Sequence, residues 1–453
     1  MGRIVFIVFI ALAACSSPEA TRRATTPIEL PPMKTFARAT PSIPRISNAV
    51  IARDILDLTF RLENGAELPV FTRFEGPITV RVVEPAPASL RPDLRRLLER
   101  LRREAKIDIR EVADDQPASI IIQPVKRSQI LGVAPSAACF VRPNVTSWSE
   151  YRARRKDPKT FWNRLSERRH MAVFLPSDVS PQEIRDCLHE EISQALGPVN
   201  DIYRLNQSVF NDDNFHTVLT GYDMLILRVI YDAALRSGLS SAEVTKRLPL
   251  ILARLNPTGG NERVAAPGPD FDVWRTAIDR ATQPGLARGK RISSARRAVA
   301  LSESAGALST RFAFSNYVLG RLTLGSDPEE ALNAFLKAGR IYQNRSDTAI
   351  QEAHVAMQLA AFQLSAGRAD TALALVNSNL AVVARSEHAA LLTLLLLVKA
   401  EALEVLGQPG KAAEIQREAL AWARYGFGDE NEIRARVAEI RAISPRPNDE
   451  GAS

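Results

Sequence analysis

The sequence predicts an α/β domain followed by an all-helical repeat domain, with a secretion signal in front. Three observations support this prediction. β-branched runs alternate with amphipathic stretches up to about residue 235, the chain beyond residue 290 is rich in Ala and Leu without a strand pattern, and the first residues are apolar and end in small side chains. With 453 residues, 45% of them hydrophobic, the chain exceeds the usual capacity of one core.

Residues 1–14, MGRIVFIVFIALAA, have the pattern of a secretion signal. They carry one cation, Arg3, and their apolar stretch is shorter than the roughly 20 residues that span a bilayer. The segment LAAC, ending at Cys15, resembles the lipobox of bacterial lipoproteins, which implies cleavage before Cys15 and lipidation of that residue. A plain cleaved signal with an incidental cysteine is the alternative. Ser16 replaces the Asp of the inner-membrane retention signal, which favours the periplasmic face of the outer membrane.

Residues 15–48 are rich in Ser, Thr, Pro and Ala, so we expect a flexible tether. The chain carries 59 Lys and Arg against 51 Asp and Glu, a net charge of +8. Outside the cytoplasm, this excess is expected to meet anionic lipid headgroups or acidic polymers, not nucleic acid. The densest basic cluster is RARRKDPKTFWNRLSERRH, residues 152–170, which a solvated loop and helix would also explain.

The α/β domain begins with an amphipathic segment, IARDILDLTF. Four runs are typical of strands, and the leucines of SLRPDLRRLLERLRREAKI recur at helical spacing, as expected for a helix that covers a sheet. The predicted strands are PITVRVVEP (77–85), IDIREV (107–112), SIIIQPV (119–125) and MAVFLP (171–176).

A further helix follows the last strand and is marked at both ends. The segment SPQE, residues 180–183, supplies an N-cap, a proline at the first position and a capping-box glutamate, and Gly197 ends the helix. At about 100° per residue, Glu191 falls inside the apolar arc, whereas His189 points away. A carboxylate on an inward face is costly unless it is partnered, protonated or metal-bound. Glu191 is therefore either a buried, hydrogen-bonded glutamate or a present or former catalytic group.

The stretch CLHEEISQALGPVND, residues 187–201, resembles the zinc-binding helix of metzincin proteases. The resemblance makes Glu191 the general base. It places a candidate, degenerate metal site at Glu190, Gln194 and Asn200, with Asp201 as a substitute third ligand.

Two motifs downstream extend the resemblance. In QSVFNDDN, Phe210 stands where metzincins carry a methionine, and LTGYDMLILRVIYD resembles the last matrixin helix, with Thr220 and Asp223 near a capping box. Taken together, residues 187–232 look like the DUF2927 family, and the order of elements extends the resemblance to residues 50–235. It implies a metalloprotease-like fold without an assigned activity.

The ligand positions depart from zinc chemistry. Zinc prefers His, Cys and carboxylate donors, whereas Gln194 and Asn200 offer amide oxygens that suit hard cations such as Ca or Mg. We therefore expect no cofactor and a non-catalytic domain whose cleft binds peptides by strand addition. His189 and His216 are expected to be solvated or hydrogen-bonded locally. The alternative is a metallopeptidase that holds zinc or another divalent cation and uses Glu191 as the base.

Two cysteines, Cys139 and Cys187, remain once Cys15 is assigned to lipid. In an oxidising envelope two such thiols can pair, and the sequence leaves the pairing open. A disulfide would hold the start of the helix at residues 181–196 to the preceding loop.

Residues 256–290 are rich in Gly and Pro and are predicted to be a linker. Residues 291–445 repeat at about 40 residues. Each repeat has a turn glycine (Gly325, Gly367, Gly407) and aligned, mostly small residues: Ala331, Ala372 and Ala412; Ala338, Asn379 and Ala419; Leu319, Ala360 and Ala400. The pattern resembles tetratricopeptide repeats, whose surfaces bind peptides or proteins. A helical bundle without repeat function is the alternative.

The sequence thus predicts an α+β metzincin-like domain over residues 49–255 and an all-α, tetratricopeptide-like domain over residues 291–445. We expect a lipid-anchored protein of the bacterial cell envelope that binds envelope proteins or peptides and acts in assembly at the membrane.

Overall fold

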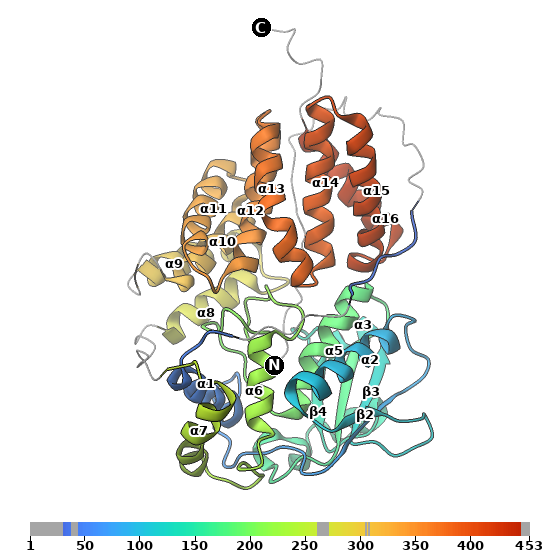
Figure 1. Cartoon of the computed structure of the whole chain (residues 1–453), viewed down its shortest axis with the longest axis vertical. Helices are drawn as coiled ribbons and strands as arrows, with labels where there is room; N and C mark the ends of the chain where they lie inside the picture. The colour runs from blue at the N-terminus through green and yellow to red at the C-terminus, as the bar shows by residue number, and fades with distance from the viewer. Residues whose placement is uncertain (1–29, 38–43, 261–270, 304–305, 307–308, 445–453) are drawn as a thin grey trace. The chain divides into compact units, whose positions relative to one another are not determined.

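The computed structural model describes residues 30–37, 44–260, 271–303, 306 and 309–444. The chain forms two compact units, one from most of residues 44–260 and one mainly from residues 30–37 and 271–444. A small mixed sheet with its helices forms the first unit, and the regular elements described in the second are all helices (Figure 1). Cys15 lies outside the described residues.

The sheet of the first unit has five strands in the order β2-β1-β3-β5-β4. Strands β2, β1, β3 and β5 are parallel, and β4 runs antiparallel to β5. The sequence indicated every strand except β4, which is too short for a clear alternation and ends in a proline. The strands are β1 (Ile78–Val82), β2 (Ile109–Glu111), β3 (Ile120–Val125), β4 (Phe140–Pro143) and β5 (Met171–Pro176).

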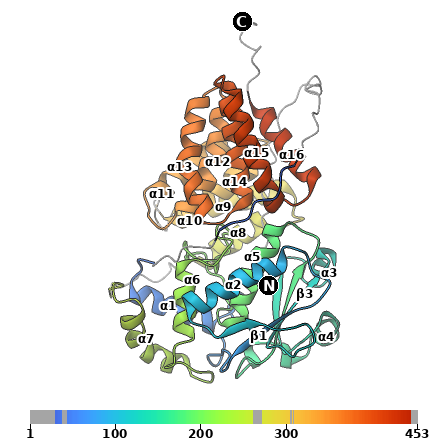
Figure 2. The same ribbon diagram turned by 45° about the vertical axis from the view of Figure 1, so that its right-hand side comes forward.

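Strand β5 is buried on both faces. Val173 and Leu175 face the main core, which also contains the apolar residues of α2, α5 and α6. Ala172 and Phe174 face a second cluster, to which α3 and α4 contribute. Figure 2 shows α3 and α4 beside the sheet. The helices of this unit are α1 (Asn48–Phe60), α2 (Leu90–Arg100), α3 (Arg127–Val133), α4 (Trp148–Arg154), α5 (Pro181–Leu196), α6 (Gly221–Ile230) and α7 (Ser241–Leu255); a π-helical turn, Leu101–Ala105, extends α2.

The second unit is built from helices joined by short turns. They are α8 (Phe271–Thr282), α9 (Arg288–Glu303), α10 (Thr310–Thr323), α11 (Pro328–Gln343), α12 (Ala349–Ser365), α13 (Ala369–Arg385), α14 (Ala389–Val405), α15 (Pro409–Gly426) and α16 (Glu430–Ile443). Each helix from α8 to α15 packs against its neighbour in sequence. Residues 271–282, which the sequence analysis placed in a linker, form α8, because the flanking Gly and Pro concealed an amphipathic run that buries Trp274 and Ile278.

Small residues allow close approach between these helices. The aligned helix positions of the repeats are all buried: Leu319, Ala331, Ala338, Ala360, Ala372, Asn379, Ala400, Ala412 and Ala419. Gly426 shows why side-chain size matters, since a Cβ there would lie 2.7 Å from the backbone nitrogen of Ala390 on α14. Among the described helices, none combines the length and the hydropathy that a bilayer-spanning segment needs.

Candidate functional site

Helix α5 carries most of the predicted site residues. It follows β5 directly, and Ile184, Leu188 and Ile192 anchor it in the main core. A disulfide joins Cys187 on α5 to Cys139, just before β4, with 6.0 Å between the two Cα atoms. Both cysteines are buried. The helix is therefore held to the sheet covalently as well as by packing.

The C-terminal end of α5 is capped by a buried arginine and a partly buried tyrosine. The guanidinium of Arg168 donates to the carbonyl oxygens of Gln194, Ala195 and Gly197, at 2.5, 2.9 and 2.6 Å. The hydroxyl of Tyr231 donates to the carbonyl of Leu196 at 3.0 Å. A cation at this end also complements the helix dipole. Burial lowers the pKa of Arg168 to about 10, so the side chain stays charged at neutral pH.

The amide nitrogens of two predicted ligands, Gln194 and Asn200, have different partners. The amide of Gln194 donates to the carboxylate of Asp201 at 3.5 Å, so these two residues do meet. The amide of Asn200 instead donates to the carbonyl oxygen of Asp57, at the end of α1, at 2.9 Å. Asn200 therefore ties the segment after α5 to α1.

Glu190 and Glu191 lie beside the disulfide. Glu191 is 2% exposed, as its place in the apolar arc predicted, and Glu190 is 9% exposed. One oxygen of each carboxylate and the sulfur of Cys139 lie within 4.8 Å of one another, a spacing at which three donors could hold a metal. The sulfur of Cys139 is already bonded to Cys187, however, so it is not a thiolate donor.

Further carboxylates surround this end of the site. Burial, followed by the nearby carboxylates of Asp201, Asp212 and Glu190, raises the pKa of Glu63 well above its ordinary value. Nothing in the sequence indicated that Glu63 and Asp212 lie near the candidate site. Glu63 comes from the loop after α1, and no local pattern connects that loop with α5. Oxygen donors of this kind suit hard divalent cations better than zinc.

The two histidines considered as ligands are both hydrogen-bonded, and His189, which helical spacing placed on the outward side of α5, is buried. His189 is buried, and its Nδ1 accepts the backbone N–H of Leu219 at 3.0 Å. Burial, and after it the charge of Arg100, lowers the pKa of His189 well below its ordinary value. His216 contacts the carbonyl oxygen of Asn206 at 3.0 Å. The side of α5 that carries His189 is buried because the segment before α6 covers it.

The start of α6 is organised around Asp223. Its buried carboxylate accepts the hydroxyl of Ser208 at 2.5 Å and the backbone N–H groups of Val209 and Thr220 at 3.2 and 2.7 Å. Burial raises the pKa of Asp223 to about 6, against the effect of these donors. Phe210, in the position of the metzincin methionine, is fully buried below them.

A buried charged cluster joins α1 to α6 and was not predicted. Asp54 on α1 accepts the hydroxyl of Tyr222 at 2.6 Å and pairs with Arg204, which also pairs with Asp57. Burial raises the pKa of Asp54, although Arg204 opposes the shift. The amphipathic spacing of residues 51–60 indicated helix α1, but it gave no sign that Asp54 would contact Tyr222 and Arg204.

The family model described as a protein of unknown function, DUF2927, matches residues 48–250. Residues 48–250 are a DUF2927 domain. The match covers the sheet, α5 with its disulfide, and the capped helix α6, and it ends inside α7. No curated protein and no solved structure matches the chain. The DUF2927 assignment supplies a family without an activity.

Proposed function

We propose that this chain is a lipid-anchored protein of the bacterial cell envelope, in which a tetratricopeptide-like helical region binds extended peptides of partner proteins. The DUF2927 domain is proposed to have a metzincin-like fold and no catalytic activity. One observation carries the proposal: residues 30–37, which are neither helix nor strand, lie on α15 as a bound peptide would.

The contacts of this segment are of the kinds that peptide-binding surfaces use. The backbone N–H of Lys34 donates to the carbonyl oxygen of Ala421 at 3.1 Å, and its ammonium pairs with Glu418 at 2.7 Å. The ring of Phe36 stacks on Trp422 with 4.5 Å between centroids. An aromatic anchor beside a charged pair gives both affinity and register.

The state of the DUF2927 site supports a non-catalytic domain. The amide N–H groups of Gln194 and Asn200 donate to Asp201 and Asp57, and the sulfur of Cys139 is bonded in the disulfide. A catalytic zinc needs three protein ligands and an open position. Two of the ligand positions of the metzincin pattern carry neutral amides here, and their N–H groups bond to neighbouring residues.

Peptide binding is tested with the full chain. Phe36→Ala should loosen the attached segment, so a labelled peptide of residues 28–40 is expected to bind this variant more tightly than the native chain, in which the tethered copy competes. Adding Trp422→Ala should abolish that binding. Adding Leu336→Ala, which removes an exposed apolar side chain from α11, should leave it unchanged. Equal binding by the native chain and all variants would refute a peptide site on α15.

A metal-dependent peptidase is the second candidate, and the carboxylates around Glu63 favour it, because a divalent cation would relieve their repulsion. The test is elemental analysis of the purified chain beside a Glu190→Gln/Asp201→Asn variant. About one equivalent of metal, lost in that variant, together with cleavage of a peptide library that Glu191→Gln abolishes, would establish the peptidase. If the native chain and the variant both contain negligible metal, the peptidase is excluded and the peptide-binding function stands.

A further inference from the structure

An open surface cavity of about 650 Å³, lined mainly by polar and charged residues, lies in the DUF2927 domain. Its lining comes from the segment after β4, from α4 and from the basic stretch that follows. The cationic and amide-bearing side chains that line it are Asn144, Arg154, Lys159, Arg164 and His170. The volume is within the range of small-molecule sites and is larger than one phosphate group needs.

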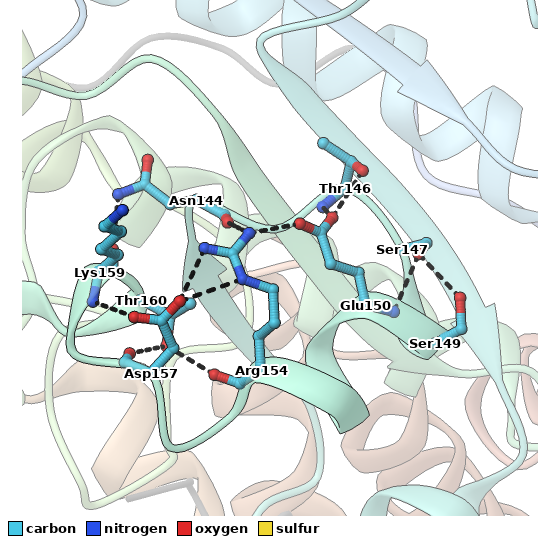
Figure 3. A network of polar contacts seen from close by, with 9 residues as sticks. All are labelled: Asn144, Thr146, Ser147, Ser149, Glu150, Arg154, Asp157, Lys159 and Thr160. Atoms are coloured by element: carbon cyan, nitrogen blue, oxygen red, sulfur yellow. Dashed lines mark hydrogen bonds and ion pairs between the residues drawn. The ribbon is translucent and has the colours of Figure 1, made fainter.

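The wall of this cavity is held by a network of hydrogen bonds (Figure 3). Asn144, with a φ of 56°, donates from its side chain to the carbonyl oxygen of Lys159 at 2.7 Å, and its backbone N–H donates to the carbonyl oxygen of His170 at 2.9 Å. Arg154 bridges Glu150 and Asp157, at 2.6 and 2.9 Å. The cavity is therefore preorganised, because both acids are held by an internal cation.

The remaining charge of the lining is positive. Arg154 is shared by Glu150 and Asp157, and Lys159 and Arg164 add two further cations, so these five side chains together carry one excess positive charge. The side chains of Lys159, Arg164 and His170 are exposed and make no hydrogen bond or ion pair with another residue that the structure describes. Cations gathered around one cavity attract anions, and an anionic ligand would neutralise them.

Further exposed cations are close in sequence to the residues that line the cavity. Arg152, Arg155 and Lys156 are exposed and lie within the basic stretch at residues 152–170. Its acid Asp157 is committed to Arg154, and Glu167 is paired with Arg169. The basic stretch that supplies Lys159 and Arg164 is therefore rich in exposed cations.

We propose that this cavity, lined by Lys159, Arg164 and His170, binds a phosphate ester. A phospholipid headgroup and a free phosphorylated small molecule share this chemistry. The guanidinium of Arg164 can bind two phosphate oxygens at once, Lys159 contributes a compact charge, and the amide of Asn144 fixes the backbone at the rim. The lipid source rests on the proposed anchoring to a membrane, whereas the small-molecule source does not.

The full chain is tested with vesicles of neutral phosphatidylcholine, with and without phosphatidylglycerol, and with inorganic phosphate and glycerol phosphate in solution. Lys159→Ala/Arg164→Ala is compared with Arg236→Ala/Lys246→Ala, which removes two exposed cations elsewhere in the same domain. Thermal unfolding verifies that both variants fold. The cavity variant is expected to lose about tenfold or more in affinity for anionic vesicles, and the control is expected to bind as the native chain does.

Loss of vesicle binding in the cavity variant alone, with competition by glycerol phosphate, supports a lipid headgroup. Loss of glycerol phosphate binding alone, without vesicle binding by the native chain, supports a free phosphate ester. Equal losses in both variants would show unspecific charge attraction and overturn the proposal. Absence of binding to every probe would also overturn it, and so would binding to a nucleic acid alone. Because the peptide assay on α15 uses other residues, failure here leaves that test unaffected.

Discussion

The backbone N–H of Leu219 donates to Nδ1 of His189 over 3.0 Å, inside the core of the DUF2927 domain. This contact requires a neutral imidazole, and burial, followed by the charge of Arg100, keeps the pKa of His189 well below its ordinary value. The unfolded chain takes up a proton at about pH 6.5, whereas the folded chain does not. The free energy of unfolding therefore falls as the pH drops below that value, by up to about 2 kcal/mol at pH 5.

Substituting His189→Gln should remove this dependence, because the amide oxygen still accepts from Leu219 but does not titrate. Urea titrations measure the decrease in the free energy of unfolding between about pH 7 and pH 5. This decrease is expected to be smaller in the variant than in the native chain, by up to about 2 kcal/mol. His170→Gln, at an exposed position, is the matched control and should follow the native chain. Identical pH profiles for the native chain and His189→Gln would contradict this assignment.

Arg168 and Arg169 are neighbours with different environments. Arg168 is buried against three carbonyl oxygens at the end of α5, whereas Arg169 is exposed and pairs with Glu167. Arg168→Met should lower the free energy of unfolding by about 3 kcal/mol, because several buried acceptors lose their donor. Arg169→Met should change it by less than about 0.5 kcal/mol. Denaturant unfolding of both variants measures the difference, and equal values would show that the cap does not stabilise α5.

The disulfide closes a loop between residues 48 positions apart. In the chain-entropy model a loop of that length contributes about 4 kcal/mol to stability. The Cys139→Ala/Cys187→Ala variant should therefore unfold at lower denaturant than the oxidised chain, by up to that amount. Since both sulfurs are buried, a thiol reductant should attack the native chain only as it unfolds. Rapid reduction of the folded chain, followed by mass spectrometry of alkylated cysteines, would argue against this protection.

Gly426 and Gly410 lie on the same helix, α15, but in different surroundings. A Cβ at Gly426 would come within 2.7 Å of the backbone of α14, whereas nothing lies within 4 Å of a Cβ at Gly410. Gly426→Ala is expected to destabilise the helical region by about 1–3 kcal/mol, since a backbone contact cannot rotate away. Gly410→Ala should be neutral or stabilise by up to about 1 kcal/mol. Circular dichroism melts compare the two variants, and a neutral Gly426→Ala would exclude close packing of α14 on α15.

Much of the element order could be predicted from the sequence because its signals are local. The β-branched runs marked β1, β3 and β5, and the proline at 181 and the glycine at 197 bounded α5. Local signals failed where they were weak. Strand β4 has four residues and one proline, and α8 was concealed by its Gly- and Pro-rich flanks.

The candidate site was only partly predictable. Helical spacing correctly placed Glu191 on a buried face of α5. The partners of that helix come from distant segments, and periodicity carries no information about them. Glu63, in the loop after α1, adds a carboxylate to the site. The carbonyl oxygen of Asp57 accepts a hydrogen bond from the amide of Asn200. Arg168, in the loop before β5, caps the C-terminal end of α5.

By itself, the sequence determined most of the helices and strands and that a carboxylate enters the core at residue 191. Only the tertiary structure decided which groups that region contacts. It joined Cys139 to Cys187, a pairing that the sequence had left open, and it buried His189 under the segment before α6. The physical reason is that periodicity and caps depend on residues within a few turns, whereas these contacts depend on how separate elements pack.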